Sequence, residues 1–174
     1  MSDPKLRVLI PASQIQHRIE ELARKISADY SGGSVLLIGI LKGACIFLAD
    51  LARALTIPAR IDFAGVSSYG GGTVSSNEVK LTKDIDLCIE GMDVLIVEDI
   101  VDSGVTLTYL CDLLAKRRPK SIRIVALLEK PERRRQPVEI HYLGFEIPNE
   151  FVVGFGLDYA EDYRNLRDIC VLEQ

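Results

Sequence analysis

Hydrophobic and polar residues follow two periods along this chain, one typical of helices and one typical of buried strands. Residues 13–29 carry apolar side chains at helical spacing, and Ser13 and Gln16 have the spacing of a capping box, so we expect an amphipathic helix there. Residues 34–41 form a continuous apolar run rich in β-branched side chains, which predicts a parallel strand buried on both faces. Residues 44–55 return to the helical period, and the succession predicts a βαβ unit.

The rest of the chain repeats this order of elements. We predict a helix over about 105–117 and strands that begin near 61 and cover 94–97, 122–128, 138–143 and 151–155. Residues 67–77 are rich in glycine and serine, which predicts a mobile hairpin tip with a return strand at 79–83. Alternating strands and helices predict a doubly wound, mainly parallel α/β sheet flanked by helices, whose ligands bind beyond the carboxyl ends of the strands.

The composition is that of one ordinary globular domain. The 174 residues are 48% hydrophobic and 26% charged, so we expect a single domain over 1–174 that needs no disulfide or metal to form its core. The formal charge of -4 gives no general attraction to nucleic acid or to anionic membranes. Residues 1–7 have no signal-peptide segment, and no apolar stretch reaches the roughly 20 residues that span a bilayer. We therefore expect a cytoplasmic protein that binds neither membranes nor nucleic acid.

The cysteines are scattered and do not form a metal-binding pattern. They are Cys45, Cys88, Cys111 and Cys170. The sequence has no C-x-x-C pair, and its two histidines lie far apart, which argues against a zinc site. We interpret the four cysteines as small, reduced core residues.

The most unusual segment is VLIVEDIVDSGVTL at 94–107. Glu98, Asp99 and Asp102 crowd the end of a predicted strand, where their repulsion calls for a cation or hydroxyl donors. The next residues, through Thr106, bring backbone N–H groups, two hydroxyls and a glycine to a helix N-terminus, which suits a phosphate monoester. A simpler interpretation is a helix capped by Asp102 or Ser103 beside surface acids, and these residues alone leave both open.

Three other known sites do not fit the sequence. A nucleotide P-loop and a dinucleotide fingerprint each require a glycine spacing that the chain lacks, because the glycines at 70–72 open no predicted helix. A receiver domain would place acids at one strand end and a Lys-Pro pair, such as Lys130 and Pro131, at another. The central acceptor aspartate between them is missing, so we exclude this site as well.

The segment at 94–107 is similar to the phosphoribosyl pyrophosphate signature of type I phosphoribosyltransferases. Four other segments resemble the hypoxanthine-guanine branch of that family: ILKGA at 40–44, SSY at 67–69, LLEKP at 127–131 and FEIPNEFVVGFGLDYAEDYRNL at 145–166. The matches occur in order and cover nearly the whole chain. The resemblance implies a type I phosphoribosyltransferase fold with a small C-terminal hood and a flexible hairpin lid. It also implies a purine salvage enzyme that makes inosine or guanosine monophosphate and pyrophosphate from phosphoribosyl pyrophosphate and hypoxanthine or guanine.

The resemblance assigns roles to the acids and to the turn after them. Glu98 and Asp99 would hold the ribose hydroxyls and a Mg²⁺ ion, and Asp158 would help to place a second Mg²⁺ on pyrophosphate. Asp102 would act as general base or acid at the imidazole ring of the purine. The 5′-phosphate would be bound by the turn residues Ser103, Gly104, Val105 and Thr106. Since some family members carry lysine where this chain has Val105, phosphate binding here would rely on backbone donors and hydroxyls.

Other residues are assigned to the pyrophosphate and to the purine. Leu41, Lys42 and Gly43 would form the pyrophosphate loop, with a cis peptide bond before Lys42, and Arg164 would reach the same group. A surface lysine and an exposed salt bridge are the ordinary alternatives for Lys42 and Arg164. Lys130 would donate to the 6-oxygen of the purine and so exclude adenine, which presents a donor there.

The remaining assignments concern the two sides of the purine. Phe151 would stack on it, although an isolated phenylalanine is more often a core residue. Backbone carbonyls near Val152 and Asp158 would accept from the 2-amino group of guanine. Ser68 and Tyr69 begin the loop that, by resemblance, would close over the reacting centre and exclude water.

Two basic clusters fall outside these roles. They consist of Lys116, Arg117, Arg118 and Lys120, and of Arg133, Arg134 and Arg135. Such runs are usually solvated surface or subunit salt bridges, but they also allow an RNA-binding regulator of nucleotide metabolism with the same fold. The family resemblance favours the enzyme and implies a homodimer or homotetramer.

Overall fold

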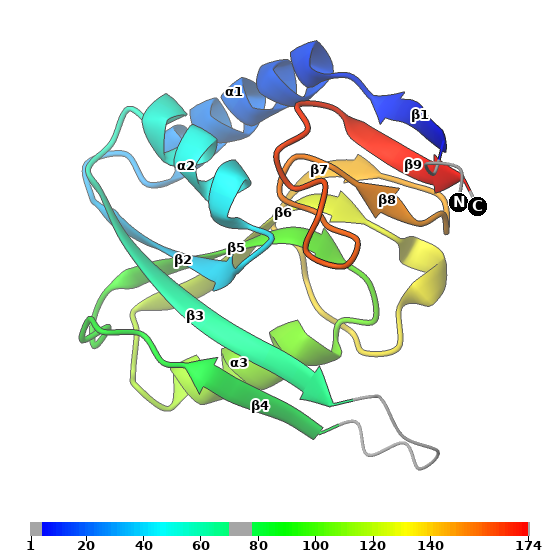
Figure 1. Ribbon diagram of the computed structural model, residues 1–174. Coiled ribbons are helices and arrows are strands. Elements are labelled where there is room, and N and C mark those ends of the chain that lie inside the picture. The colour runs from blue at the N-terminus through cyan, green and yellow to red at the C-terminus, as the bar shows by residue number, and fades with distance from the viewer. Residues whose placement is uncertain (1–4, 70–77, 174) are drawn as a thin grey trace.

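The centre of the molecule is a six-stranded sheet, seen in a computed structural model that describes residues 5–69 and 78–173 (Figure 1). Its strands are β2 (Val35–Leu41), β3 (Ala59–Tyr69), β4 (Glu78–Lys83), β5 (Asp93–Val101), β6 (Ser121–Glu129) and β7 (Tyr142–Glu146). They lie in the order β4-β3-β2-β5-β6-β7, and all neighbours are parallel except β3 and β4. The predicted doubly wound, mainly parallel α/β sheet is therefore confirmed.

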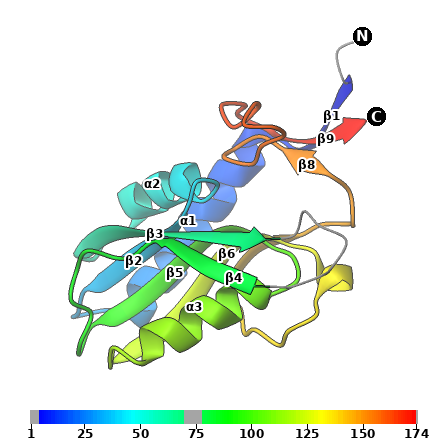
Figure 2. The ribbon, with the colours of Figure 1, turned by 60° about the horizontal axis from the view of Figure 1, so that its bottom comes forward.

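Helices cover both faces of this sheet. Their bounds are α1 (Ala12–Asp29), α2 (Cys45–Ala54) and α3 (Val105–Ala115), with a short 3-10 helix η1 at Pro131–Arg133. Figures 1 and 2 show α1 and α2 on one face and α3 on the other. Leu37 of β2 packs in the core under α1 and α2, whereas Leu36 and Ile38 pack in the core under α3. The continuous apolar run of β2 thus results from burial on both faces. None of the helices in the described ranges is long and apolar enough to cross a membrane.

A second sheet forms a hood near the carboxyl ends of the parallel strands (Figure 1). Its strands are β1 (Lys5–Ile10), β8 (Val152–Val153) and β9 (Ile169–Glu173), paired antiparallel in the order β1-β9-β8. Lys5 pairs with Glu173, so the first and last described residues meet in this sheet. The expected C-terminal hood is present in β8 and β9, and β1 from the N-terminal part of the chain adds one of its edges.

Two predicted strand positions need correction. β7 begins at Tyr142 instead of 138, and Pro137 just before the predicted start has no N–H to donate to a ladder. The strand predicted over 151–155 shrinks to the two residues of β8, because the chain turns at Gly154 and Gly156, which have φ values of 98° and 100°. β3 also continues through residues 67–69, which were predicted as loop, while 70–77 lie outside the described residues.

Two local expectations are also wrong. The capping box at Ser13 does not form, because α1 begins at Ala12, whose N–H donates instead to Oδ1 of Asp168 at 2.7 Å. Of the four cysteines, only Cys170 is buried, and Cys45 and Cys88 are exposed. An apolar stretch does not bury every residue in it when one face of the element meets solvent.

Candidate functional site

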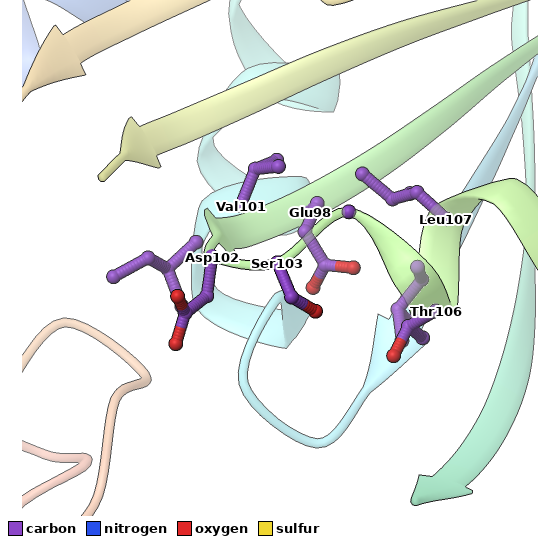
Figure 3. A pocket seen from close by; sticks show the side chains of 9 residues that line it. Glu98, Val101, Asp102, Ser103, Thr106 and Leu107 are labelled. Carbon is purple, nitrogen blue, oxygen red and sulfur yellow. The ribbon is translucent and has the colours of Figure 1, made fainter. Parts of the chain in front are cut away.

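The turn between β5 and α3 lines a small pocket of about 160 Å³. Gly104 precedes α3 with φ 80°, a conformation that glycine adopts without strain. Gly104 has no side chain to cap α3, but Ser103 Oγ accepts a long hydrogen bond at 3.4 Å from the N–H of Val105, as the capping interpretation expects of Ser103. The first N–H groups of a helix have no helical acceptor, and Figure 3 shows the side chains of Ser103 and Thr106 at the start of α3. The turn thus has the donors and the positive helix end that a phosphate requires.

Glu98 and Asp99 form a pair of carboxyl groups near the end of β5, with Glu98 buried and Asp99 partly buried. Glu98 is 7% exposed, and burial raises its pKa well above the ordinary value, as does the neighbouring Asp99. Burial also raises the pKa of Asp99, while a hydrogen bond from Glu98 and the N–H of Ile100 lower it. Burial therefore disfavours ionisation of this pair, most strongly at Glu98.

We expect Glu98→Gln to stabilise the free protein at pH 7 by about 1 to 3 kcal/mol, because a neutral amide of the same shape replaces a buried ionisable group. A carboxyl with a raised pKa stabilises the fold below its ordinary value of 4.5, and this stability is lost as pH rises toward the raised value. The difference between variant and wild type should therefore open above pH 4.5 in urea denaturation.

The matched control is Glu20→Gln, on the exposed side of α1, which should show no such difference. Wild-type protein that equals or exceeds the Glu98 variant in stability at pH 7 would contradict the buried carboxyl pair.

Asp102 and Lys130 follow neighbouring strands and face the same space. Val101 of β5 pairs with Glu129 of β6. Asp102 and Lys130, which follow these two residues, therefore lie side by side. Lys130 is buried at 7% exposure; burial lowers the pKa of its ammonium, nearby Arg133 lowers it further, and Asp102 opposes both. Arg133 Nε also lies 2.7 Å from Asp102 Oδ1. The site therefore presents a buried cationic donor beside a carboxylate acceptor.

Just after Lys130 the chain folds back against the phosphate turn. The N–H groups of residues 135 and 136 donate to the carbonyl oxygen of Ser103 at 2.9 and 3.0 Å. Arg134 forms an ion pair with Glu129 and is only 20% exposed, so its interpretation as solvated surface is wrong. Sequence reasoning missed this support of the phosphate turn, and its one available signal was a run of arginines three residues after Lys130.

The loop after β2 packs tightly against the carboxyl pair. The peptide bond between Leu41 and Lys42 is cis, as predicted. A Cβ atom on Gly43 would lie 1.7 Å from Oδ2 of Asp99, and a Cβ on Gly156 would lie 2.1 Å from the carbonyl oxygen of Gly43. The loop, the carboxyl pair and the hood are thus in direct contact, with space only for glycine at these two positions.

We expect Gly43→Ala to lower the free energy of unfolding by about 1 to 3 kcal/mol, since the added methyl group collides with Asp99 and forces the loop or the carboxyl group to move. Thermal unfolding of the free protein measures this change. Gly33→Ala is the matched control, because its nearest atom would lie at an ordinary 3.5 Å. Equal melting temperatures for both variants would show that the loop has more room than the structure gives it.

The hood brings two further predicted residues, Asp158 and Arg164, to this loop. Arg164 Nη2 lies 2.9 Å from Asp158 Oδ1, and Nη1 donates to the carbonyl oxygen of Gly156 at 2.8 Å. Lys42 Nζ lies 2.8 Å from Oε2 of Glu161 in the same segment of the hood. The structure therefore brings Lys42, Asp158 and Arg164 together from distant parts of the sequence.

The remaining predicted residues lie around this region. Phe151 is 51% exposed and meets the ring of Tyr159 edge to face at 5.8 Å, so it is not a core aromatic, whereas Val152 is buried. Ser68 and Tyr69 are the last residues of β3 and pair through their backbones with β4. The lid predicted beyond them lies outside the described residues.

The first basic cluster is largely neutralised within the chain. Its ion pairs are Arg117 with Asp84 at 2.7 Å, Arg118 with Glu90 at 2.9 Å, and Lys120 with Asp93 at 2.7 Å. This arrangement agrees with the interpretation of the cluster as solvated surface. It leaves little free positive charge for a nucleic-acid backbone.

The acidic residues suit a magnesium ion that is shared with a substrate. Within residues 5–69 and 78–173 no three His, Cys, Asp or Glu side chains are grouped to hold a metal by themselves. Magnesium commonly takes one or two carboxylates together with substrate phosphates, and Glu98 and Asp99 supply such oxygen ligands. A cation beside them would also offset the cost of burying two acids. The residues therefore fit a magnesium ion that is bound together with a phosphate compound.

Known proteins match this chain over most of its length. The phosphoribosyl transferase domain family matches residues 11–160. A hypoxanthine-guanine phosphoribosyltransferase of Bacillus subtilis is 50% identical over 167 residues, which is 96% of this chain and 93% of the relative. A crystal structure of a hypoxanthine-guanine phosphoribosyltransferase from Bacillus anthracis has a TM-score of 0.92 at 45% identity, and the match covers 98% of this chain and 99% of that one.

Some relatives are much longer than this chain. The bifunctional protein TilS/HprT of Listeria innocua is 52% identical over 167 residues, which is 96% of this chain and 26% of the relative. The chain therefore spans about a quarter of the length of that protein.

Proposed function

Because the chain belongs to the phosphoribosyltransferase family, we propose that it transfers the phosphoribosyl group of phosphoribosyl pyrophosphate to hypoxanthine or guanine in purine salvage. The products are inosine or guanosine monophosphate and pyrophosphate. The observation that carries this proposal is the buried ammonium of Lys130 beside the carboxylate of Asp102. A 6-oxopurine offers an oxygen acceptor for the first and a ring N–H donor for the second.

In the proposed reaction a purine ring nitrogen forms a bond to the anomeric carbon of the ribose as the bond from that carbon to pyrophosphate breaks. Asp102 takes the proton that the purine ring loses, and Arg133 Nε, 2.7 Å from its Oδ1, holds the carboxylate beside the purine. The transition state resembles an oxocarbenium ion, with negative charge growing on the leaving group. Phe151 would stack on the purine, and the carbonyls near Val152 and Asp158 would accept from the amino group of guanine.

The phosphates are bound around this centre. Backbone N–H groups and hydroxyls of residues 103–106 would hold the 5′-phosphate at the start of α3. Leu41, Lys42, Gly43 and Arg164 would bind the pyrophosphate, and Ser68 and Tyr69 would begin the lid. Glu98, Asp99 and Asp158 would hold Mg²⁺, which when bound supplies positive charge to the leaving pyrophosphate. A cytoplasmic location and a homodimer or homotetramer belong to the same proposal.

The proposal is tested by turnover. Purified protein with magnesium chloride, phosphoribosyl pyrophosphate and hypoxanthine should give inosine monophosphate and pyrophosphate in equal amounts, and excess EDTA should stop the reaction. The basic clusters supply the second candidate, an RNA-binding regulator. Folded protein that binds phosphoribosyl pyrophosphate and RNA without any turnover would favour that regulator and contradict the enzyme.

A further inference from the structure

Glu161 occupies a position between two cations of the site. Its Oε2 lies 2.8 Å from Lys42 Nζ and 3.6 Å from Arg164 Nη2, so one carboxylate oxygen bridges both side chains. Lys42 comes from the loop after β2 and Arg164 from the hood. The bridge therefore spans the two parts of the molecule that would grip the pyrophosphate in the proposed function.

The hood segment holds this carboxylate in place through its backbone. The N–H of Glu161 donates to Oδ2 of Asp158 at 2.9 Å, and Tyr159 and Asp162 exchange backbone hydrogen bonds at 3.0 and 3.2 Å. Glu161 is thus positioned by a closed turn and does not reach the cations from a distant element.

The two cations differ in how firmly they are anchored. Arg164 also bonds to the carbonyl oxygen of Gly156 and pairs with Asp158, and its side chain is 25% exposed. Lys42 and Glu161 are each 66% exposed, so their ion pair separates at little cost in water. Movement of the Glu161 side chain would therefore free Lys42 and remove one of the two carboxylates beside Arg164 Nη2, without rebuilding the hood.

A carboxylate and a phosphate group compete for the same donors. Both accept charge-assisted hydrogen bonds from an ammonium and from a guanidinium, and a bound phosphate oxygen would stand where Oε2 of Glu161 stands now. We propose that Glu161 is a built-in competitor of pyrophosphate, which occupies Lys42 and Arg164 in the free enzyme and weakens the binding of this group. The inference rests on the proposed function, which assigns the two cations to pyrophosphate.

The competitor has a consequence for turnover. Pyrophosphate is a product that must dissociate after the reaction. The Glu161 carboxylate favours this dissociation when it pairs again with Lys42 and Arg164. Removal of the Glu161 charge should tighten the binding of pyrophosphate and of phosphoribosyl pyrophosphate, since both would use the same two cations.

The test is Glu161→Gln, which keeps the shape of the side chain and removes its charge. Its control is Glu20→Gln, which makes the same change in net charge on the exposed side of α1. Titration calorimetry with inorganic pyrophosphate in magnesium chloride should show that the Glu161 variant binds roughly three- to tenfold more tightly than wild type, as expected for the loss of one exposed and one partly buried ion pair. The control variant should bind as wild type does.

The opposite result would overturn the inference. Unchanged or weaker binding by Glu161→Gln would mean that the residue holds the cations in place. Weaker binding only in the presence of magnesium would mean that it is a ligand of the metal.

The binding measurement needs no catalysis, so it separates the two proposals. Tighter binding by the variant in a protein that converts no purine would support the competitor and contradict the proposed reaction. Normal purine turnover with unchanged pyrophosphate binding in the variant would support the proposed reaction and contradict the role of Glu161 as a competitor.

Discussion

Asp102→Asn should lower kcat for the formation of inosine monophosphate by about 10²- to 10⁴-fold, the usual range for the loss of a positioned general base. The amide cannot take the proton that the purine ring loses, although it fills the same space. Asp102 lies beside the phosphate turn and not within its backbone donors, so phosphoribosyl pyrophosphate should still bind. Steady-state kinetics and calorimetric binding of phosphoribosyl pyrophosphate measure the two quantities separately.

A control for this variant is Asp112→Asn on the exposed face of α3, which makes the same change of carboxylate to amide in the helix that follows the turn and should leave kcat unchanged. Asp102→Ala should lose as much activity as Asp102→Asn, because both lack the base. Full activity in either Asp102 variant would contradict the proposed role, as would a loss explained entirely by weaker binding of phosphoribosyl pyrophosphate.

Lys130→Met should lower kcat/KM for hypoxanthine by about 10²- to 10³-fold, because a site built to donate to a 6-oxygen loses its donor and leaves that oxygen unpaired. Methionine keeps most of the buried volume of lysine. The preference for hypoxanthine over adenine should therefore collapse, and parallel kinetics with both bases measure it.

The pH dependence of hypoxanthine use gives a second measure of Lys130. Burial lowers the pKa of its ammonium, so the charge is lost at a lower pH than the ordinary 10.5. In wild type, kcat/KM for hypoxanthine should fall as the pH rises through this lowered pKa, and the fall should be absent in Lys130→Met. A variant that retains both the alkaline fall and the preference over adenine would contradict the assignment.

Elements whose hydrophobic pattern or motif lies within one short segment could be predicted from the sequence. The apolar run at 34–41 became the buried strand β2, and the helical spacing of residues 13–29 became α1. The turn after β5 was equally accessible, because acids, hydroxyls and a glycine follow one another between a strand and a helix. In each case the signal and the structure it forms occupy the same short stretch of chain.

The hood shows what the sequence could not give. β1 is exposed along most of its length, so its residues carry no strong apolar pattern, and its partner β9 lies at the other end of the chain. Their pairing joins Lys5 to Glu173, and no local propensity reports a contact over such a separation. The helical period of α1 likewise could not show that Asp168 would supply its N-terminal hydrogen bond.

The same limit applies to the candidate site. The residues that resemble family motifs were identified in advance, because each motif lies in one segment. Arg133 at Asp102, Arg134 at Glu129 and Glu161 at Lys42 were not, since each contact depends on how separate segments pack. These contacts surround the reacting groups with charges whose effect depends on three-dimensional position.

The most direct test of the central claim compares four bases under one set of conditions. Purified protein, magnesium chloride and phosphoribosyl pyrophosphate are mixed with hypoxanthine, guanine, xanthine or adenine, and nucleotide formation is followed by chromatography. Rapid formation of inosine or guanosine monophosphate, with none of the adenine nucleotide, is the predicted result. Two results would contradict the account: nucleotide formation from adenine at the same rate as from hypoxanthine, and no nucleotide formation with any of the four bases.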